Sequence, residues 1–208
     1  NAIIGERLEV DILNTIFDTC EDIVLTSKQN ENYKDFRLNV LTVLGLDFDK
    51  LNEEDFKQKQ PEDITRELFK AVNENYNNKN KSISEAAYPI LKKIKKERGG
   101  VVKDILIPFT DGNRQIGVSV NLDESLENNG ENIIKEMQKI VSLGMIDLNW
   151  KEHLREMDDL KQSVQSAVYE QKDPLVIYKF EGFELFKKFI AKVNQDTVSF
   201  LTKCLIPI

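Results

Sequence analysis

Apolar residues recur every three or four positions over a long stretch near the end of the chain, and this period predicts one face of a long helix. The residues of that face are Ile140, Leu143, Ile146, Trp150, Leu154, Met157, Leu160 and Val164. The pattern stops near Tyr169 and begins again at Leu175, with Leu185 and Phe189 on the same face. A long helix, a short polar loop and a second long helix predict an antiparallel helical hairpin.

The break between these two helices carries residues that start a helix. The carboxylate of Asp173 can accept hydrogen bonds from the free N–H groups of a first helical turn. Pro174 suits the first helical position, because the N–H that proline lacks has no partner there in any case. The second helix is therefore expected to begin at Pro174, and the tip of the hairpin to lie between Tyr169 and Lys172.

The centre of this hairpin reads WKEHLREMDDLKQSVQSAVYEQKDPLVIYKFEGFELF. It resembles the two-helix finger of SecA, the ATP-driven motor of bacterial protein export. The matching residues stand in one unbroken register: Trp150, Lys151, Glu152, His153, Leu154, Met157, Asp158, Leu160, Tyr169, Gln171, Lys172, Asp173, Pro174, Tyr178, Lys179, Glu181, Phe183 and Phe186. So many matches in one register make the resemblance specific.

Several residues of this stretch depart from the family pattern. Before the tip, Ser166-Ala167 stand where the family has Leu-Arg. Lys161 and Ser163 stand in place of Arg and Gly, while Ile177 replaces an acid and Phe180 a base. The expected fold tolerates these changes, but no role of the missing charges is carried over to this chain.

The resemblance and the residue patterns together predict a mainly α fold in two parts. Residues 1–130 are expected to form a helical wing domain with a small β-hairpin near residues 101–122. Residues 131–208 are expected to form a helical scaffold segment that includes the long antiparallel two-helix finger. The expected structural anchors of the finger are Trp150, Leu154, Met157, Asp173, Pro174 and Tyr178.

The resemblance also implies a function. Tyr169, Gln171 and Lys172 at the finger tip are expected to contact an unfolded preprotein at the mouth of the SecYEG channel. ATP and Mg are expected in nucleotide-binding domains upstream of this chain, because the sequence contains no Gly-x-x-x-x-Gly-Lys-[Ser/Thr] phosphate loop. The implied location is the cytoplasm, with peripheral attachment to the inner membrane through the translocon. Since the chain starts without Met and inside a helical pattern, we expect it to be part of a larger protein.

The remainder of the chain predicts helices joined by polar connections. The expected helices occupy residues 3–25, 33–44, 61–76 and 83–98, the second ending at Gly45. The stretches LTSKQNENYKD and NNKNKS are expected to be loops, residues 46–60 a loop with one or two short turns, and residues 123–132 an acidic link. Between residues 101 and 122 the residues alternate and are rich in β-branched types, with a turn signal at Thr110 to Asn113, which predicts a β-hairpin.

Composition limits the partners. The net charge of −7 argues against duplex nucleic acid, and no apolar run is long enough to cross a bilayer. Cys20 and Cys204 stand far apart without the spacing of metal ligands and are interpreted as reduced thiols. The basic run from Lys92 to Arg98 is explained by the preference of cations for a helix C-terminus, although an anionic membrane surface is an alternative partner.

Candidate catalytic or metal-binding residues are few. His153 is the only histidine, and a metal or acid–base site would need converging partners beside it. Trp150 is interpreted as a core anchor, and Asp158 and Asp159 as solvated because adjacent helical residues do not face each other. We therefore assign no catalytic, metal or cofactor residue to this chain. The alternatives to a motor segment are a helical adaptor module and an enzyme without a recognisable motif.

Overall fold

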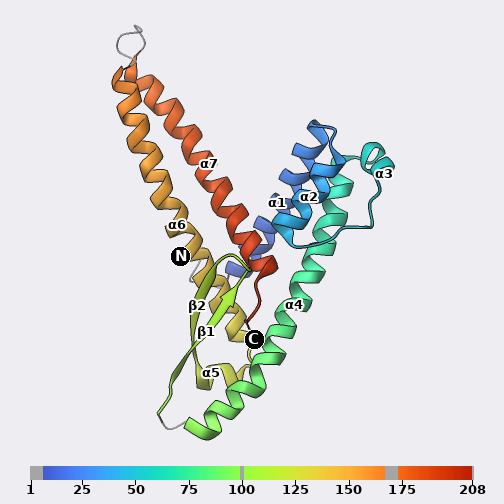
Figure 1. The fold of residues 1–208 in the computed structure, drawn as a ribbon, viewed down its shortest axis with the longest axis vertical. Helices are drawn as coiled ribbons and strands as arrows, with labels where there is room; N and C mark the ends of the chain where they lie inside the picture. Colours follow the sequence, from blue (N-terminus) through green and yellow to red (C-terminus); the bar gives the residue numbers. More distant parts are fainter. Residues whose placement is uncertain (1–6, 99–100, 167–172, 208) are drawn as a thin grey trace.

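The computed structural model describes residues 7–98, 101–166 and 173–207, and it is mainly α. Its elements in chain order are α1 (Leu8–Gln29), α2 (Tyr33–Leu44), α3 (Glu53–Gln58), α4 (Pro61–Arg98), β1 (Asp104–Thr110), β2 (Gln115–Asn121), α5 (Leu122–Glu127), α6 (Glu131–Ser166) and α7 (Pro174–Lys203). In Figure 1, α6 and α7 rise together on one side, and α1 to α3 stand with the upper part of α4 on the other. The hairpin, α5 and the end of α4 lie at the opposite end of the molecule.

The predicted mainly α fold with a long helical pair is confirmed. α1 lies largely within the helix predicted for residues 3–25, and it buries one periodic face at Ile12, Ile16, Cys20 and Val24. The predicted end of α2 is also confirmed, because Gly45 adopts a left-handed φ of 63° and its N–H bonds the carbonyl of Leu41. Local sequence signals are thus sufficient where a cap or a periodic face decides the structure.

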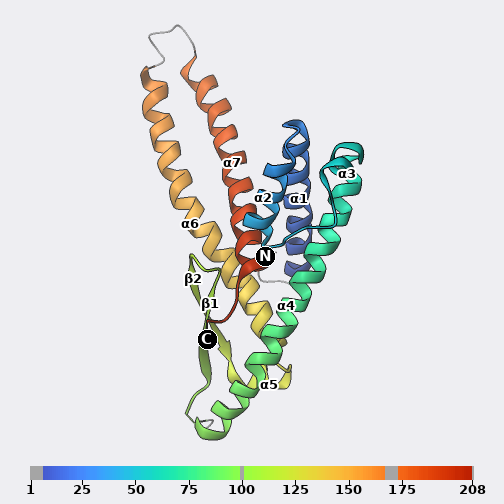
Figure 2. The same cartoon turned by 45° about the vertical axis from the view of Figure 1, so that its right-hand side comes forward.

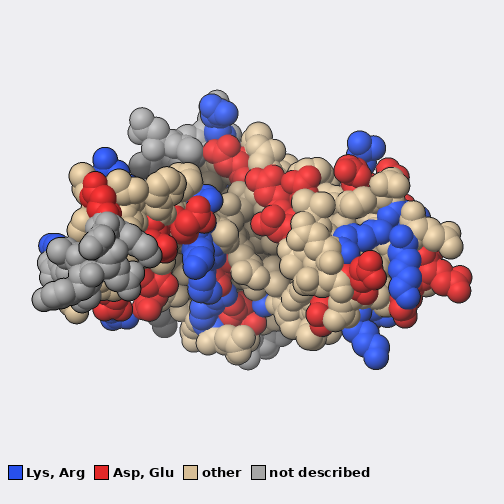
Figure 3. Space-filling model, turned by 90° about the horizontal axis from the view of Figure 1, so that it is seen from above, with Lys and Arg blue, Asp and Glu red and all other residues tan. Residues whose placement is uncertain are grey.

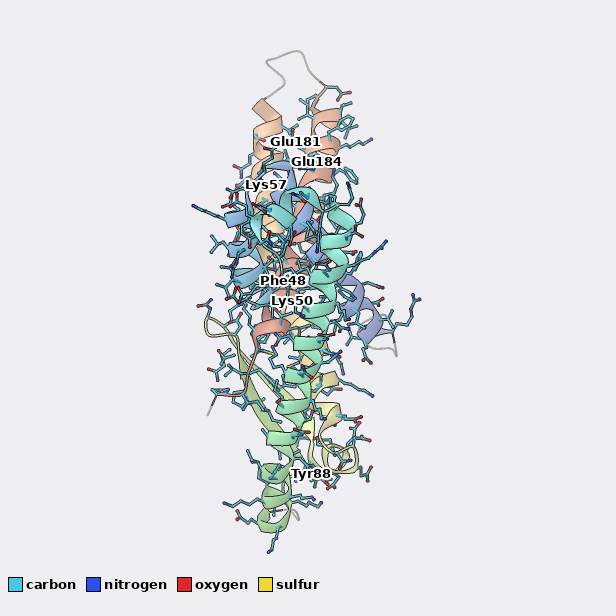
Figure 4. The ribbon with its side chains drawn as sticks, turned by 90° about the vertical axis from the view of Figure 1, so that its right-hand side faces the viewer. Phe48, Lys50, Lys57, Tyr88, Glu181 and Glu184 are labelled. Carbon is cyan, nitrogen blue, oxygen red and sulfur yellow. The ribbon has the colours of Figure 1, made fainter. Side chains whose placement is uncertain are left out.

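Phe48 belongs to an aromatic group that fills the region between α2 and α3 (Figure 4). Its ring lies 6.4 Å from that of Phe36, and Phe36 in turn lies 5.1 Å from Phe56. The side chain of Asn52 accepts from the N–H of Asp55 and starts α3. The loop with one or two short turns expected at residues 46–60 therefore contains one short helix, α3.

The predicted loop NNKNKS is wrong, and the predicted connection LTSKQNENYKD is shorter than expected. α1 continues to Gln29, and α4 is one continuous helix through NNKNKS, with Pro89 inside it on an exposed position. The buried side of α4 runs through the polar segment, since Tyr76 and Ile83 on either side of it are both buried. Tertiary packing therefore overrides the loop-like composition of this segment.

The predicted β-hairpin is confirmed. β1 pairs with β2 from Asp104–Asn121 to Thr110–Gln115, and Gly112 in the turn has a φ of 93°. One face of the hairpin is buried at Ile107, Phe109, Val118 and Val120. The acidic link expected at residues 123–132 contains a short helix, because Asn121 accepts from the N–H groups of Asp123 and Glu124 and starts α5 there.

A single cluster of buried apolar residues joins the two predicted parts of the chain. Ile16, Phe36 and Leu68 from the first part share this core with Met137 and Phe200 from the second. The division near residue 130 itself stays a prediction. Within the described ranges, no helix combines the length and the apolar character that a membrane crossing requires.

The partly buried Lys79 links α4 to the end of α7. Its Nζ donates to the carbonyl of Leu201 at 2.8 Å. Partial burial lowers the pKa of Lys79 from 10.5 to about 8, while the nearby Cys204 acts in the opposite direction. The folded protein therefore holds this proton less tightly than the unfolded chain does.

The lowered pKa predicts a pH dependence of stability. Below pH 8 Lys79 is charged in both the folded and the unfolded protein, so the cost of desolvating its charge destabilises the fold in full. This destabilisation is lost as the pH rises from 8 to 10.5, because Lys79 becomes neutral in the folded protein first. Relative to Lys79→Met, the free energy of unfolding of the natural protein should rise by about 3 kcal/mol over that interval. Urea titrations of both proteins at several pH values measure this difference, and parallel stability curves would contradict it.

Candidate functional site

The helical pair α6 and α7 is the part of the molecule that the resemblance marks as functional (Figures 1 and 2). The side chain of Asp173 accepts from the N–H of Leu175 at 2.9 Å, and Pro174 occupies the first turn of α7. The predicted start of the second helix is therefore confirmed. Tyr169, Gln171 and Lys172 lie outside the described residues, and their role at the tip stays a prediction.

The buried stripe of α6 differs from the predicted face. Its residues stand four positions apart: Ile133, Met137, Val141, Met145, Asn149 and His153. Leu143, Trp150 and Leu154 of the predicted face are 43%, 42% and 48% exposed. The prediction that Leu154 faces into the helical pair and that Trp150 is a core anchor is therefore wrong, whereas Val164 and Phe189 are buried as expected.

The cause of this error is polar burial. Asn149 and His153 continue the stripe begun by Met145, but a hydrophobic pattern does not count them. The side-chain amide of Asn149 donates to the carbonyl of Met145 at 2.9 Å and to Asp196 Oδ2 at 3.1 Å. These hydrogen bonds satisfy the buried amide of Asn149. A polar residue can therefore occupy a buried position that hydrophobic periodicity would reserve for an apolar residue.

Aromatic rings hold the middle of the pair together. The ring of His153 stacks on that of Phe189 with centroids 5.1 Å apart, and Phe186 lies 6.0 Å from His153. Trp150 packs edge-on against Phe189 at 5.4 Å, at the margin of this cluster. The geometry gives His153 a packing role, because the neighbours of its ring are the aromatic rings of Trp150, Phe186 and Phe189.

Gly182 brings the two helices close together nearer the tip. A Cβ added at this position would lie 3.3 Å from Met157 Cε and 3.9 Å from Leu160 Cδ2. Met157, one of the predicted anchors, therefore packs directly against the backbone of α7. Tyr178, another predicted anchor, is half-buried one helical turn before Gly182.

This close approach predicts that a large side chain at Gly182 is destabilising. Gly182→Leu should lower the free energy of unfolding by roughly 1–3 kcal/mol, because the new side chain must displace Met157 and Leu160. Glu181→Leu places the same side chain on the neighbouring, exposed position and should cost less than about 0.5 kcal/mol. Chemical denaturation of both variants checks the packing, which equal losses would contradict.

A polar network anchors the base of the pair to the β-hairpin. Asp196 on α7 lies 3.7 Å from Arg114 Nη1, and the guanidinium of Arg114 also pairs with Asp111 at 3.0 Å. The Asp111 side chain is 1% exposed. Burial opposes its ionisation, but the N–H groups of Arg114 and Asn113 and the guanidinium outweigh burial and lower the pKa of Asp111.

Sequence reasoning missed Arg114, Asp111 and Asp196. Asp111 was interpreted only as part of a turn signal, and Asp196 lies 82 positions further along the chain than Arg114. Their pairing depends on α7 passing the hairpin turn, which no local pattern encodes. The one sequence signal for this network is Arg114 itself, a charged residue directly after the predicted turn at Thr110 to Asn113.

The other chemical candidates have ordinary surroundings. Asp158 and Asp159 are exposed, and the described residues contain no His, Cys, Asp and Glu group able to hold a metal ion. In the basic run, Lys92 lies over the ring of Tyr88 at 4.3 Å and Lys95 pairs with Asp123 at 2.5 Å. On the face seen in Figure 3, basic and acidic side chains are interspersed.

Comparison with known proteins decides the family. A family model described as the SecA wing and scaffold domain matches residues 1–205. The chain belongs to the SecA family. The protein translocase subunit SecA of Cytophaga hutchinsonii is 45% identical over 207 residues, covering 100% of this chain and 18% of that protein. The SecA proteins of Christiangramia forsetii and Porphyromonas gingivalis are 42% and 39% identical, over 18% and 19% of their lengths.

The SecA resemblance of the finger is thereby confirmed and extends along the chain. The chain spans about a fifth of the length of these SecA proteins, since it covers 18–19% of each. Its finger, α6 and α7, presents apolar side chains to the surface as well as to its interior. Leu175, Phe180 and Phe183 of α7 are 59%, 70% and 59% exposed.

Proposed function

We propose that the two-helix finger engages an unfolded preprotein at its tip during ATP-driven protein export. The observation that carries this proposal is the finger itself: α6 and α7 form a long antiparallel pair whose base is packed into the core. The upper part of α7 is largely exposed, so the pair projects from the body of the molecule (Figure 1). Membership in the SecA family supports the link to protein translocation.

A finger of this kind is suited to transmit displacement. Helices resist bending when their backbone hydrogen bonds are intact, and here the aromatic cluster and Gly182 hold α6 and α7 together along their length. Movement imposed at the base should therefore appear at the tip. By resemblance, the nucleotide-binding domains of the full protein, with ATP and Mg, impose that movement, and the SecYEG channel receives the tip.

Tyrosine at the tip suits contact with many different sequences. The ring of Tyr169 offers apolar area and a hydroxyl with few torsions to order. The implied place of action is the cytoplasmic side of the inner membrane, where the translocon, and an anionic membrane surface, are expected partners. A helical adaptor without motor function is the second candidate, and the exposed Phe180 and Phe183 of α7 are the observation that favours it.

Site-specific photo-crosslinking in the full-length protein tests the proposed contact. A photoreactive phenylalanine at position 169 should crosslink to a preprotein arrested during transport into channel-containing vesicles. The same residue at position 41 is the control, because Leu41 is open to solvent, at 52% exposure, and lies on α2. Crosslinks of equal yield from both positions, or none from position 169, would contradict the proposal.

A further inference from the structure

A mostly apolar groove lies between α4, the outer edge of β1 and the segment that follows α7. Its volume is about 570 Å³. Apolar side chains line its length: Ile83, Ala87, Ile90, Ile105, Leu106 and Leu205. Among the described lining residues, Lys79 and Ser82 are the two with polar side chains. A volume of this size is typical of small-molecule sites.

The polar residues lie at one end of the groove. On α4, Lys79 stands about one turn before Ile83, where the apolar lining begins, and Ser82 directly precedes Ile83. One proton of the Lys79 ammonium is donated to the Leu201 carbonyl, which leaves two further donors. Among the described residues, no carboxylate pairs with Lys79, although partial burial raises the free-energy cost of its charge. A ligand carboxylate would therefore supply a missing counter-charge.

The apolar part is long and open to solvent. From Lys79 to Ile94 the lining helix rises by about 22 Å. Ile90 and Leu106 on the two sides of the groove are 59% and 69% exposed. Apolar surface of this extent is costly to leave in water, and a hydrocarbon chain laid along the groove would cover it.

The edge of β1 distinguishes a hydrocarbon from an extended peptide. Thr110 directs its N–H and C=O outward and exchanges two 2.9 Å hydrogen bonds with Leu205. The next outward-directed residue is Pro108, which has no N–H to donate. A peptide strand continuing along this edge would therefore lack one ladder hydrogen bond at Pro108, whereas the single positive charge at one end of an otherwise apolar groove suits a ligand with one charged end.

We propose that this groove binds a long-chain fatty acid, with its carboxylate at Lys79 and Ser82 and its hydrocarbon chain between α4 and β1. This site is separate from the finger tip, and its occupation does not depend on preprotein contact. The bound chain would cover Ile90 and Leu106 and so join the helix to the hairpin.

Calorimetric titration of the full-length protein with monomeric oleate tests the proposal. Oleate should bind saturably, and Ile90→Glu should weaken binding at least about tenfold, because it places a carboxylate in the path of the hydrocarbon chain. Ile90 is exposed, so the substitution leaves the core intact. Leu41→Glu, the same change at a 52% exposed residue of α2, should leave the affinity unchanged.

The ligand's head group provides a second, independent measurement. Oleyl alcohol has the same chain without the charge and should bind at least about tenfold more weakly than oleate, a preference that Lys79→Met should abolish. Equal affinity of the natural protein and Ile90→Glu for oleate, or equal binding of oleate and oleyl alcohol, would overturn the proposal. Binding of an apolar peptide or of phosphatidylcholine vesicles, with none of monomeric oleate, would also overturn it.

Discussion

Replacing Phe200 with alanine is expected to lower the free energy of unfolding by about 3–5 kcal/mol. Phe200 is fully buried in the last part of α7, where the finger enters the core shared with α1 and α4. The Arg114 guanidinium lies 5.8 Å from the centre of its ring. Removing the ring would leave a cavity at the junction that fixes the base of the finger.

Phe180 provides the matched control for this substitution. It is the same residue type on the same helix, but it is 70% exposed. Phe180→Ala should therefore change the free energy of unfolding by less than about 0.5 kcal/mol. Urea denaturation of the 208-residue chain measures the free energy of unfolding of both variants, and the comparison is valid if the dependence of that free energy on urea concentration is the same for both. Similar losses for both would show that the base of α7 is not packed as described.

The parts of the fold that were predicted correctly depend on neighbouring residues. Asp173 and Pro174 start α7, Gly45 ends α2, and the alternation around Gly112 forms the β-hairpin. In each case a cap, a left-handed residue or a period of two decides the conformation within a few positions. The finger was recognised for the same reason, because its residues stand in one continuous stretch.

The parts that were wrong depend on distant contacts. The segment NNKNKS is helical because the buried side of α4 continues through it and Lys79 reaches the end of α7. The buried stripe of α6 includes Asn149 and His153, whose partners Asp196 and Phe189 lie on the other helix of the finger. Hydrophobic periodicity cannot identify a polar residue whose burial is compensated by a partner far along the chain.

The second large effect is expected at the finger tip, where the proposed function can be separated from folding. In the full-length protein, Tyr169→Ala should leave thermal stability and basal ATP hydrolysis near the wild-type values. A tip side chain that acts on a passing polypeptide contributes to transport rather than to the core. Tyr169→Phe keeps the ring and should retain much of the transport activity. Ser166-Ala167 stand near Tyr169 in place of the family's Leu-Arg. We expect them to affect the size of the transport defect of Tyr169→Ala but not its direction.

The most direct test of this account is the rate of ATP-driven preprotein transport into channel-containing vesicles by the Tyr169→Ala protein. We expect the rate to fall at least about tenfold, since loss of a central aromatic contact commonly costs more than 1 kcal/mol of binding energy. A helical adaptor with a structural tip predicts a lowered melting temperature and no selective defect in transport. A wild-type transport rate for Tyr169→Ala would contradict the proposed contact between the finger tip and the preprotein.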